Sequence, residues 1–155
     1  MHRLLLIVTA AILLFSLSAF AQNKASIEKL DPALDAIVPA GARLELLKDG
    51  FKDGLEGGVW IRQGGYLLFS NKPERTITKW TPDGKFSTYL NLAEGTKVGD
   101  PKATLSSGTT MDKEGRLVYC SPGDRAIIRI ERDGKRTIVA DKFEGKRFSH
   151  AVNLL

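Results

Sequence analysis

One stretch of the sequence repeats itself without a gap, fifty residues further along the chain: residues 58–90 align with residues 108–140. The identical matches are Gly58 with Gly108, Gly65 with Gly115, Leu67 with Leu117, Arg75 with Arg125, Ile77 with Ile127, and the Asp-Gly-Lys triplets at 83–85 and 133–135. A fixed period of roughly 20–50 residues is the signature of stacked structural units that bury their apolar faces against one another. The chain is therefore expected to contain two similar units and the beginning of a third.

Each copy has the pattern of four short strands separated by turns. The expected strands are 56–61, 66–70, 76–81 and 86–90 in the first copy, and 108–112, 116–120, 126–131 and 137–140 in the second. Asp-Gly precedes the fourth strand of both copies, at residues 83–84 and 133–134. Because Asp-Gly between apolar runs is a strong hairpin signal, each copy is expected to form an antiparallel four-stranded meander.

Four-stranded meanders with this period are the blades of a β-propeller, a fold that uses about four to eight of them. The sequence therefore predicts an all-β chain with blades at 56–91 and 106–141 and the start of a third at 148–155. Two blades alone leave apolar faces and strand edges open to self-association. Three explanations compete: a truncated gene product, an assembly such as three chains closing one six-bladed ring, or a small standalone binding module. The start of a third blade favours truncation.

Residues 1–21 have the features of a secretory signal peptide: a basic start, an apolar run, and the A-x-A-like site Ala19-Phe20-Ala21. We expect cleavage before Gln22, a periplasmic or secreted protein, and no membrane association afterwards. Residues 22–55 form a lead-in, in which 25–30 is expected to make a short helical turn and 43–47 a strand.

The charge pattern and the cysteine content indicate which partners and cross-links to expect. The net charge is +5, but acids and bases alternate along the chain, as in residues 131–136. Nucleic-acid binding needs basic side chains gathered on one face, so no nucleic-acid partner is expected. Cys120 is the single cysteine and lies in an apolar run, which predicts a buried, unreactive thiol and no internal disulfide.

Several segments resemble one family. They are Gly50-Phe51-Lys52 with residues 56–60 (E-G-G-V-W), residues 65–70 and 80–85, residues 112–118, and residues 140–148. From about Leu30 onward the chain resembles the N-terminal portion of the gluconolactonase and senescence-marker-protein (regucalcin-like) family of six-bladed propellers. The resemblance covers nearly all of the chain that follows the signal peptide.

That resemblance implies a carboxylic-ester hydrolase that acts on a small lactone or sugar-acid derivative. It also implies one divalent metal, calcium or zinc, at the centre of a complete propeller. The resemblance places the first metal ligand on Glu56, which starts an inner strand. Without the resemblance, Glu56 would be interpreted as a solvent-exposed acidic residue at the start of a strand. Ser106 stands at the matching place of the second repeat, so an acid is not a feature of every blade.

The chain departs from the family pattern at three places, the first of which is Gly58, where the family usually has Pro. Residues 120–123 read C-S-P-G where the family has C-E-H-G, and residues 150–153 read H-A-V-N where it has S-P-N-D. Asn153 and His150 are the candidate substrate-binding residues, and the catalytic residue stays unknown. The family's other ligands belong to later blades, so we expect a weakly active or inactive hydrolase. The alternative is a non-catalytic exported propeller fragment that binds a carbohydrate or protein partner.

Overall fold

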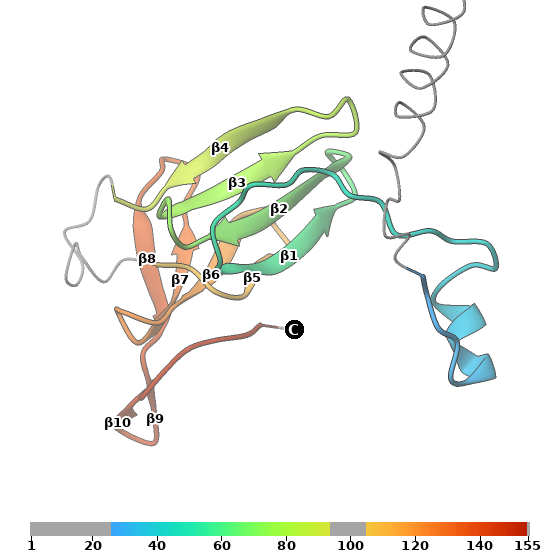
Figure 1. Cartoon of the computed structure of the whole chain (residues 1–155). Helices are drawn as coiled ribbons and strands as arrows, with labels where there is room; N and C mark the ends of the chain where they lie inside the picture. Colours follow the sequence, from blue (N-terminus) through green and yellow to red (C-terminus); the bar gives the residue numbers. More distant parts are fainter. Residues whose placement is uncertain (1–25, 94–104, 155) are drawn as a thin grey trace, which may run out of the picture. The chain divides into compact units, whose positions relative to one another are not determined.

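The structure, a computed structural model, describes residues 26–93 and 105–154 (Figure 1). The chain divides into two units, residues 1–46 and residues 47–155. The predicted signal peptide lies outside the described residues. In the described part of the first unit, the regular element is the 3-10 helix η1 (Pro32–Ala36), capped by Asp31, whose side chain accepts a 2.7 Å hydrogen bond from the Ala33 amide.

Two expectations for the lead-in were wrong. The helical turn expected at 25–30 is absent from residues 26–30, and the helix begins instead at Pro32. Proline fits the first turn of a helix because its missing N–H would be unpaired there. Residues 43–47 form no strand, and Leu44 and Leu46 are exposed, because an apolar alternation becomes a strand only where a partner strand is present.

The first repeat forms a four-stranded antiparallel sheet in the order β1-β2-β3-β4. Its strands are β1 (Leu55–Ile61), β2 (Tyr66–Asn71), β3 (Thr76–Trp80) and β4 (Phe86–Asn91). The hairpin between β3 and β4 turns at Gly84, whose φ of 84° lies in the left-handed region that glycine adopts at no steric cost.

The second repeat forms the same sheet in the order β5-β6-β7-β8. Its strands are β5 (Thr109–Met111), β6 (Leu117–Ser121), β7 (Ala126–Ile130) and β8 (Arg136–Ala140). The two sheets also share the same backbone irregularities. The ladder shifts register after Ile77 in one sheet and after Ile127 in the other, and Arg75 and Arg125 have φ values of 55° and 54°. All eight predicted strands are therefore confirmed, with bounds within one residue.

The segment after β8 contains an element that was not predicted from the sequence. A small hairpin, β9 (Lys142–Phe143) and β10 (Lys146–Arg147), turns at Glu144 and Gly145, which both have positive φ. The strand expected to begin at the C-terminus is not formed by residues 151–154. Val152 nevertheless accepts a 2.6 Å hydrogen bond from the amide of Gly108, just before β5.

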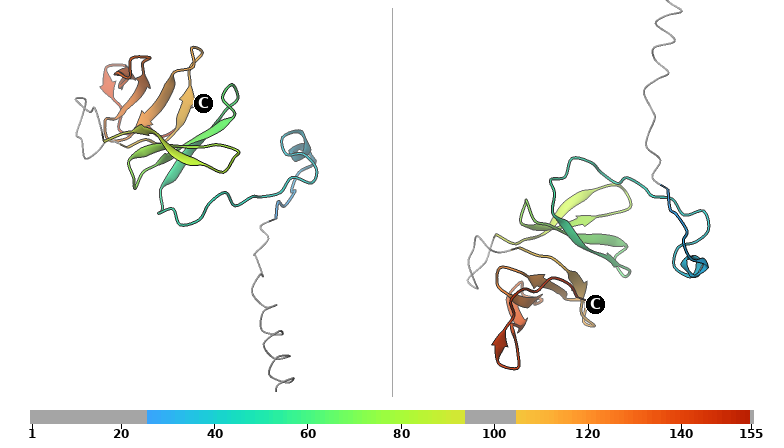
Figure 2. Two further views of the ribbon diagram at one scale, coloured as in Figure 1. Left: turned by 90° about the horizontal axis from the view of Figure 1, so that it is seen from above. Right: turned by 60° about the horizontal axis from the view of Figure 1, so that its bottom comes forward.

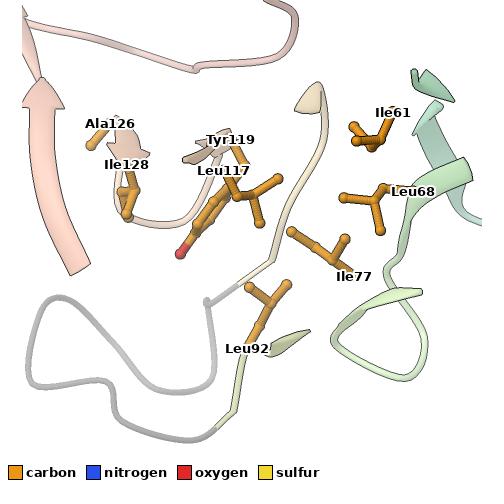
Figure 3. Packing of buried hydrophobic residues seen from close by; sticks show 8 residues of the cluster. All are labelled: Ile61, Leu68, Ile77, Leu92, Leu117, Tyr119, Ala126 and Ile128. Atoms are coloured by element: carbon orange, nitrogen blue, oxygen red, sulfur yellow. The ribbon is translucent and has the colours of Figure 1, made fainter. Parts of the chain in front are cut away.

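The two sheets of the second unit lie side by side and share one apolar core (Figure 2). The buried members are Ile61, Leu68 and Ile77 from the first repeat, Leu92 just after it, and Leu117, Tyr119, Ala126 and Ile128 from the second repeat. Figure 3 shows Leu68 and Ile77 on one side of this layer and Leu117 and Tyr119 beside them.

The two sheets contribute opposite faces to this shared core. The first sheet contributes Leu68 and Ile77, whose counterparts fifty residues later are Val118 and Ile127. The second sheet contributes Leu117 and Tyr119 instead, the counterparts of Leu67 and Phe69. Because side chains alternate between the faces of a strand, this is a head-to-tail contact and not a two-fold sandwich. Successive propeller blades pack in this way, so the fold is all-β and corresponds to part of a propeller.

Candidate functional site

Inner strands approach one another closely at two glycines. A Cβ on Gly57, in β1, would lie 2.1 Å from the carbonyl oxygen of Ser107, next to β5. A Cβ on Gly108 would lie 2.8 Å from the Cα of Asn153. The backbone of β1 at Gly57 therefore lies against residues 107–108, which in turn lie against residues 152–154, and we call the place where they meet the inner-strand region.

Buried hydroxyl groups fix the inner-strand region. The Ser106 hydroxyl donates to the Ser70 hydroxyl, and the Ser70 hydroxyl donates to the Ser107 carbonyl, both at 2.7 Å. Ser70 and Ser106 are fully buried. Thr109 donates a further hydrogen bond to the carbonyl of Gly57. These bonds satisfy polar groups that would otherwise be costly to bury, and they join the two sheets at this end.

Glu56 lies at the edge of the inner-strand region, as the second residue of β1. Its Oε1 is 2.5 Å from the Nζ of Lys72, and 39% of its side-chain surface is exposed. The Lys72 hydrogen bond lowers the pKa of Glu56 below its ordinary value, a hydrogen bond from Ser107 adds to this, and partial burial opposes it. The side chain is therefore an ionised carboxylate at neutral pH.

The described residues do not by themselves fit a divalent metal. Residues 26–93 and 105–154 contain no cluster of three or more His, Cys, Asp or Glu side chains that could hold an ion. Calcium takes six to eight oxygen ligands, and zinc takes four ligands in most sites. Glu56 supplies one carboxylate, and the Lys72 ammonium already neutralises it.

A hollow of about 460 Å³ borders Glu56 on the first sheet. Its lining residues are Leu47, Lys48, Phe51, Leu55, Glu56, Gly57, Gly58, Leu67, Phe69 and Phe86. The Phe51 ring meets Phe69 and Phe86 edge-on, at centroid distances of 5.8 and 5.7 Å. The Lys48 ammonium lies 5.0 Å from the centre of the Phe51 ring, so the hollow is apolar with one cation at its side.

His150 and Asn153 lie outside the set of residues that line this hollow. Both are exposed, and Asn153 has its backbone against Gly108 in the inner-strand region. Their predicted contact with substrate stays a prediction. Lys72 and the aromatic hollow were not foreseen from the sequence, although Phe51 stands in a motif that pointed to the family.

Cys120 is buried as predicted, with 1% of its surface exposed. Burial raises the pKa of its thiol, which keeps it protonated and poorly nucleophilic at neutral pH. This is the state of a packing residue.

Across the described residues 26–93 and 105–154, no helix combines the length and the hydrophobicity needed to span a membrane.

Comparisons with known proteins find gluconolactonases among the proteins similar to this chain. A curated gluconolactonase from Zymomonas mobilis is 33% identical over 132 residues, which is 83% of this chain and 37% of that protein. A solved structure of a candidate gluconolactonase aligns with a TM-score of 0.61 and 28% identity, over 83% of this chain and 41% of its own. A gluconolactonase from Xanthomonas campestris aligns with a TM-score of 0.60 and 28% identity, over 79% and 37%. No protein-family model matches the chain.

The two sheets and their packing define part of a propeller of the gluconolactonase type. The resemblance predicted from the sequence is confirmed: the chain is a relative of the gluconolactonases. It spans about two fifths of the length of the proteins that it matches.

Proposed function

We propose that this chain is part of an exported hydrolase that opens small sugar lactones. The observation that carries the proposal is the ionised carboxylate of Glu56 at the edge of the inner-strand region, in a chain similar to gluconolactonases. Export rests on the signal-peptide pattern of residues 1–21. The substrate class rests on the names of the relatives, one of which is described as a gluconolactonase of glucose secondary metabolism.

Hydrolysis of a lactone needs a polarised ring carbonyl and a positioned water molecule. In the complete propeller we propose that a divalent metal, calcium or zinc, supplies the polarisation. The described residues contribute Glu56 to such a site and cannot complete it. What Glu56 can do alone is accept a hydrogen bond from a substrate hydroxyl or a water, because its carboxylate is ionised and partly exposed.

The direct test is a chimera. Residues 26–154 of this chain would replace the aligned segment of the Zymomonas mobilis gluconolactonase, and hydrolysis of glucono-δ-lactone would be followed by acid release. We expect an active chimera that loses about 100-fold or more of its activity on Glu56→Gln, the scale on which a positioned polar group contributes to catalysis. Glu114→Gln, in an exposed turn, is the matched control and should retain activity.

A folded chimera that is inactive, or one that is indifferent to Glu56→Gln, would contradict the proposal. For the 155-residue chain alone we expect hydrolysis near the uncatalysed rate with or without added calcium or zinc. Metal-dependent hydrolysis that a chelator abolishes would show that this expectation is wrong.

The second candidate is a non-catalytic exported propeller fragment that binds a carbohydrate or a protein. One observation favours it: Lys72 forms an ion pair with Glu56, the carboxylate that the hydrolase would need as a metal ligand. The metal content of the purified chimera separates the two, because the hydrolase requires an ion in the complete propeller and the binding module does not.

A further inference from the structure

The ion pair at the edge of the inner-strand region links two neighbouring strands. Glu56 stands opposite Ser70 in the β1–β2 ladder, and Lys72 follows one residue after β2 ends at Asn71. The Lys72 amide donates a 3.2 Å hydrogen bond to the Gly54 carbonyl, which fixes its backbone beside the start of β1. The lysine therefore reaches Glu56 from an anchored position.

Both side chains are partly shielded from water. The exposed fractions are 28% for the Lys72 side chain and 39% for Glu56. A charge pair in such surroundings is screened less than one on an open surface. A second cation that approached Glu56 would therefore meet the repulsion of the ammonium at short range.

We infer that Lys72 is a built-in counter-ion that competes with a divalent cation for the carboxylate of Glu56. A divalent ion that binds Glu56 has to displace the ammonium, so the affinity of this carboxylate for the ion is lower than it would be without the lysine. The location of Glu56 follows from the structure, and the inference holds whether or not the complete protein hydrolyses a lactone. It explains why Glu56 can stand at this place without a ready cation site around it in the described part of the chain.

Manganese(II) is a suitable probe, because it broadens the NMR signals of nearby amides even when it binds weakly. The full chain would be titrated with manganese, and the broadening of the Glu56 and Gly57 amide signals would be followed. We expect Lys72→Met to lower the half-broadening concentration about tenfold, since removing a like charge a few ångströms away favours the ion. Lys72→Gln should do the same, and it serves if the methionine variant fails to fold.

Lys85→Met is the matched control. Lys85 pairs with Asp83 in an exposed turn, so the variant removes the same charge from a different carboxylate. In this variant the half-broadening concentration at Glu56 should stay within about twofold of that of the unaltered chain, because the Lys85 ammonium is exposed to solvent and pairs with Asp83.

Two results would overturn the inference. One is an unchanged half-broadening concentration in folded Lys72→Met and Lys72→Gln chains. The other is a gain that survives in the double variant Glu56→Gln with Lys72→Met, because the ion would then bind another group. Neither result depends on the chimera assay, so failure of the hydrolase proposal and failure of this inference are distinguishable.

Discussion

Gly57 is the residue at which the packing of the inner strands is most restrictive. Its φ is 60°, in the left-handed region, and the Ser107 carbonyl oxygen occupies the place where a side chain would begin. Both facts exclude an ordinary side chain, one through backbone strain and the other through a backbone clash. The glycine is thus a condition for bringing Glu56 beside the second sheet.

Gly57→Ala should lower the free energy of unfolding by about 3 kcal/mol or more, the range of severe single substitutions. Gly84→Ala is the control: its φ is 84°, but a Cβ there meets nothing within 4 Å. The control should lose only the cost of the left-handed conformation, about 1–2 kcal/mol. Urea unfolding of both variants measures the difference, and equal losses would show that the inner strands do not approach as described.

The lowered pKa of Glu56 predicts a pH-dependent contribution to stability. The Glu56–Lys72 interaction should be fully present above the unfolded-state pKa of glutamate, about 4.3, and should disappear as the pH falls through the lower folded-state pKa. Glu56→Gln should therefore be less stable than the unaltered chain at pH 7, by about 0.2–1 kcal/mol, and equally stable at strongly acidic pH. Denaturant unfolding between these pH values tests this, and a difference that grows on acidification would contradict it.

At the scale of elements, the repeated strands were predictable because their signals are local. Apolar alternation bounded by glycine turns specifies a meander without knowledge of distant residues. Residues 43–47 carry a similar alternation and form no strand, because pairing depends on a neighbour that local sequence does not reveal. The β9–β10 hairpin was not predicted because each of its strands has two residues, which is too short to show an alternation of apolar and polar residues.

Tyr119, on strand β6, buries a polar group that is not hydrogen-bonded in the described part of the chain. The side chain is fully buried on β6, and within residues 26–93 and 105–154 its hydroxyl has no hydrogen-bond partner. Burial raises its pKa to about 12. A buried hydroxyl without a partner costs free energy, so the ring and not the hydroxyl is expected to stabilise the sheet contact.

Tyr119→Phe should therefore leave the free energy of unfolding unchanged or raise it by up to about 1 kcal/mol. Tyr119→Ala, which removes the ring as well, should cost about 3–5 kcal/mol. Thermal or urea unfolding of the two variants provides the measurement. A loss of more than about 1 kcal/mol for Tyr119→Phe would mean that the hydroxyl contributes a hydrogen bond.

At the scale of the whole molecule, the period of the repeat implied stacked sheets, and the fold agrees. The candidate site was harder to predict from the sequence than the fold. The role assigned to Glu56 came from a resemblance, and its partner Lys72 is sixteen residues away along the chain. Only the antiparallel return of β2 beside β1 brings the two together, and their pairing could not be read from spacing alone.

Head-to-tail packing of consecutive blades is the claim on which the position of Glu56 depends. Nuclear Overhauser effects between side chains of the two sheets test it most directly. Consecutive blades predict cross-peaks between Ile77 or Leu68 methyl protons and the Tyr119 ring, together with contacts between Gly57 and Ser107. Cross-peaks between Phe69 and Tyr119, which join corresponding faces of the two repeats, would instead show a two-fold sandwich and contradict the propeller.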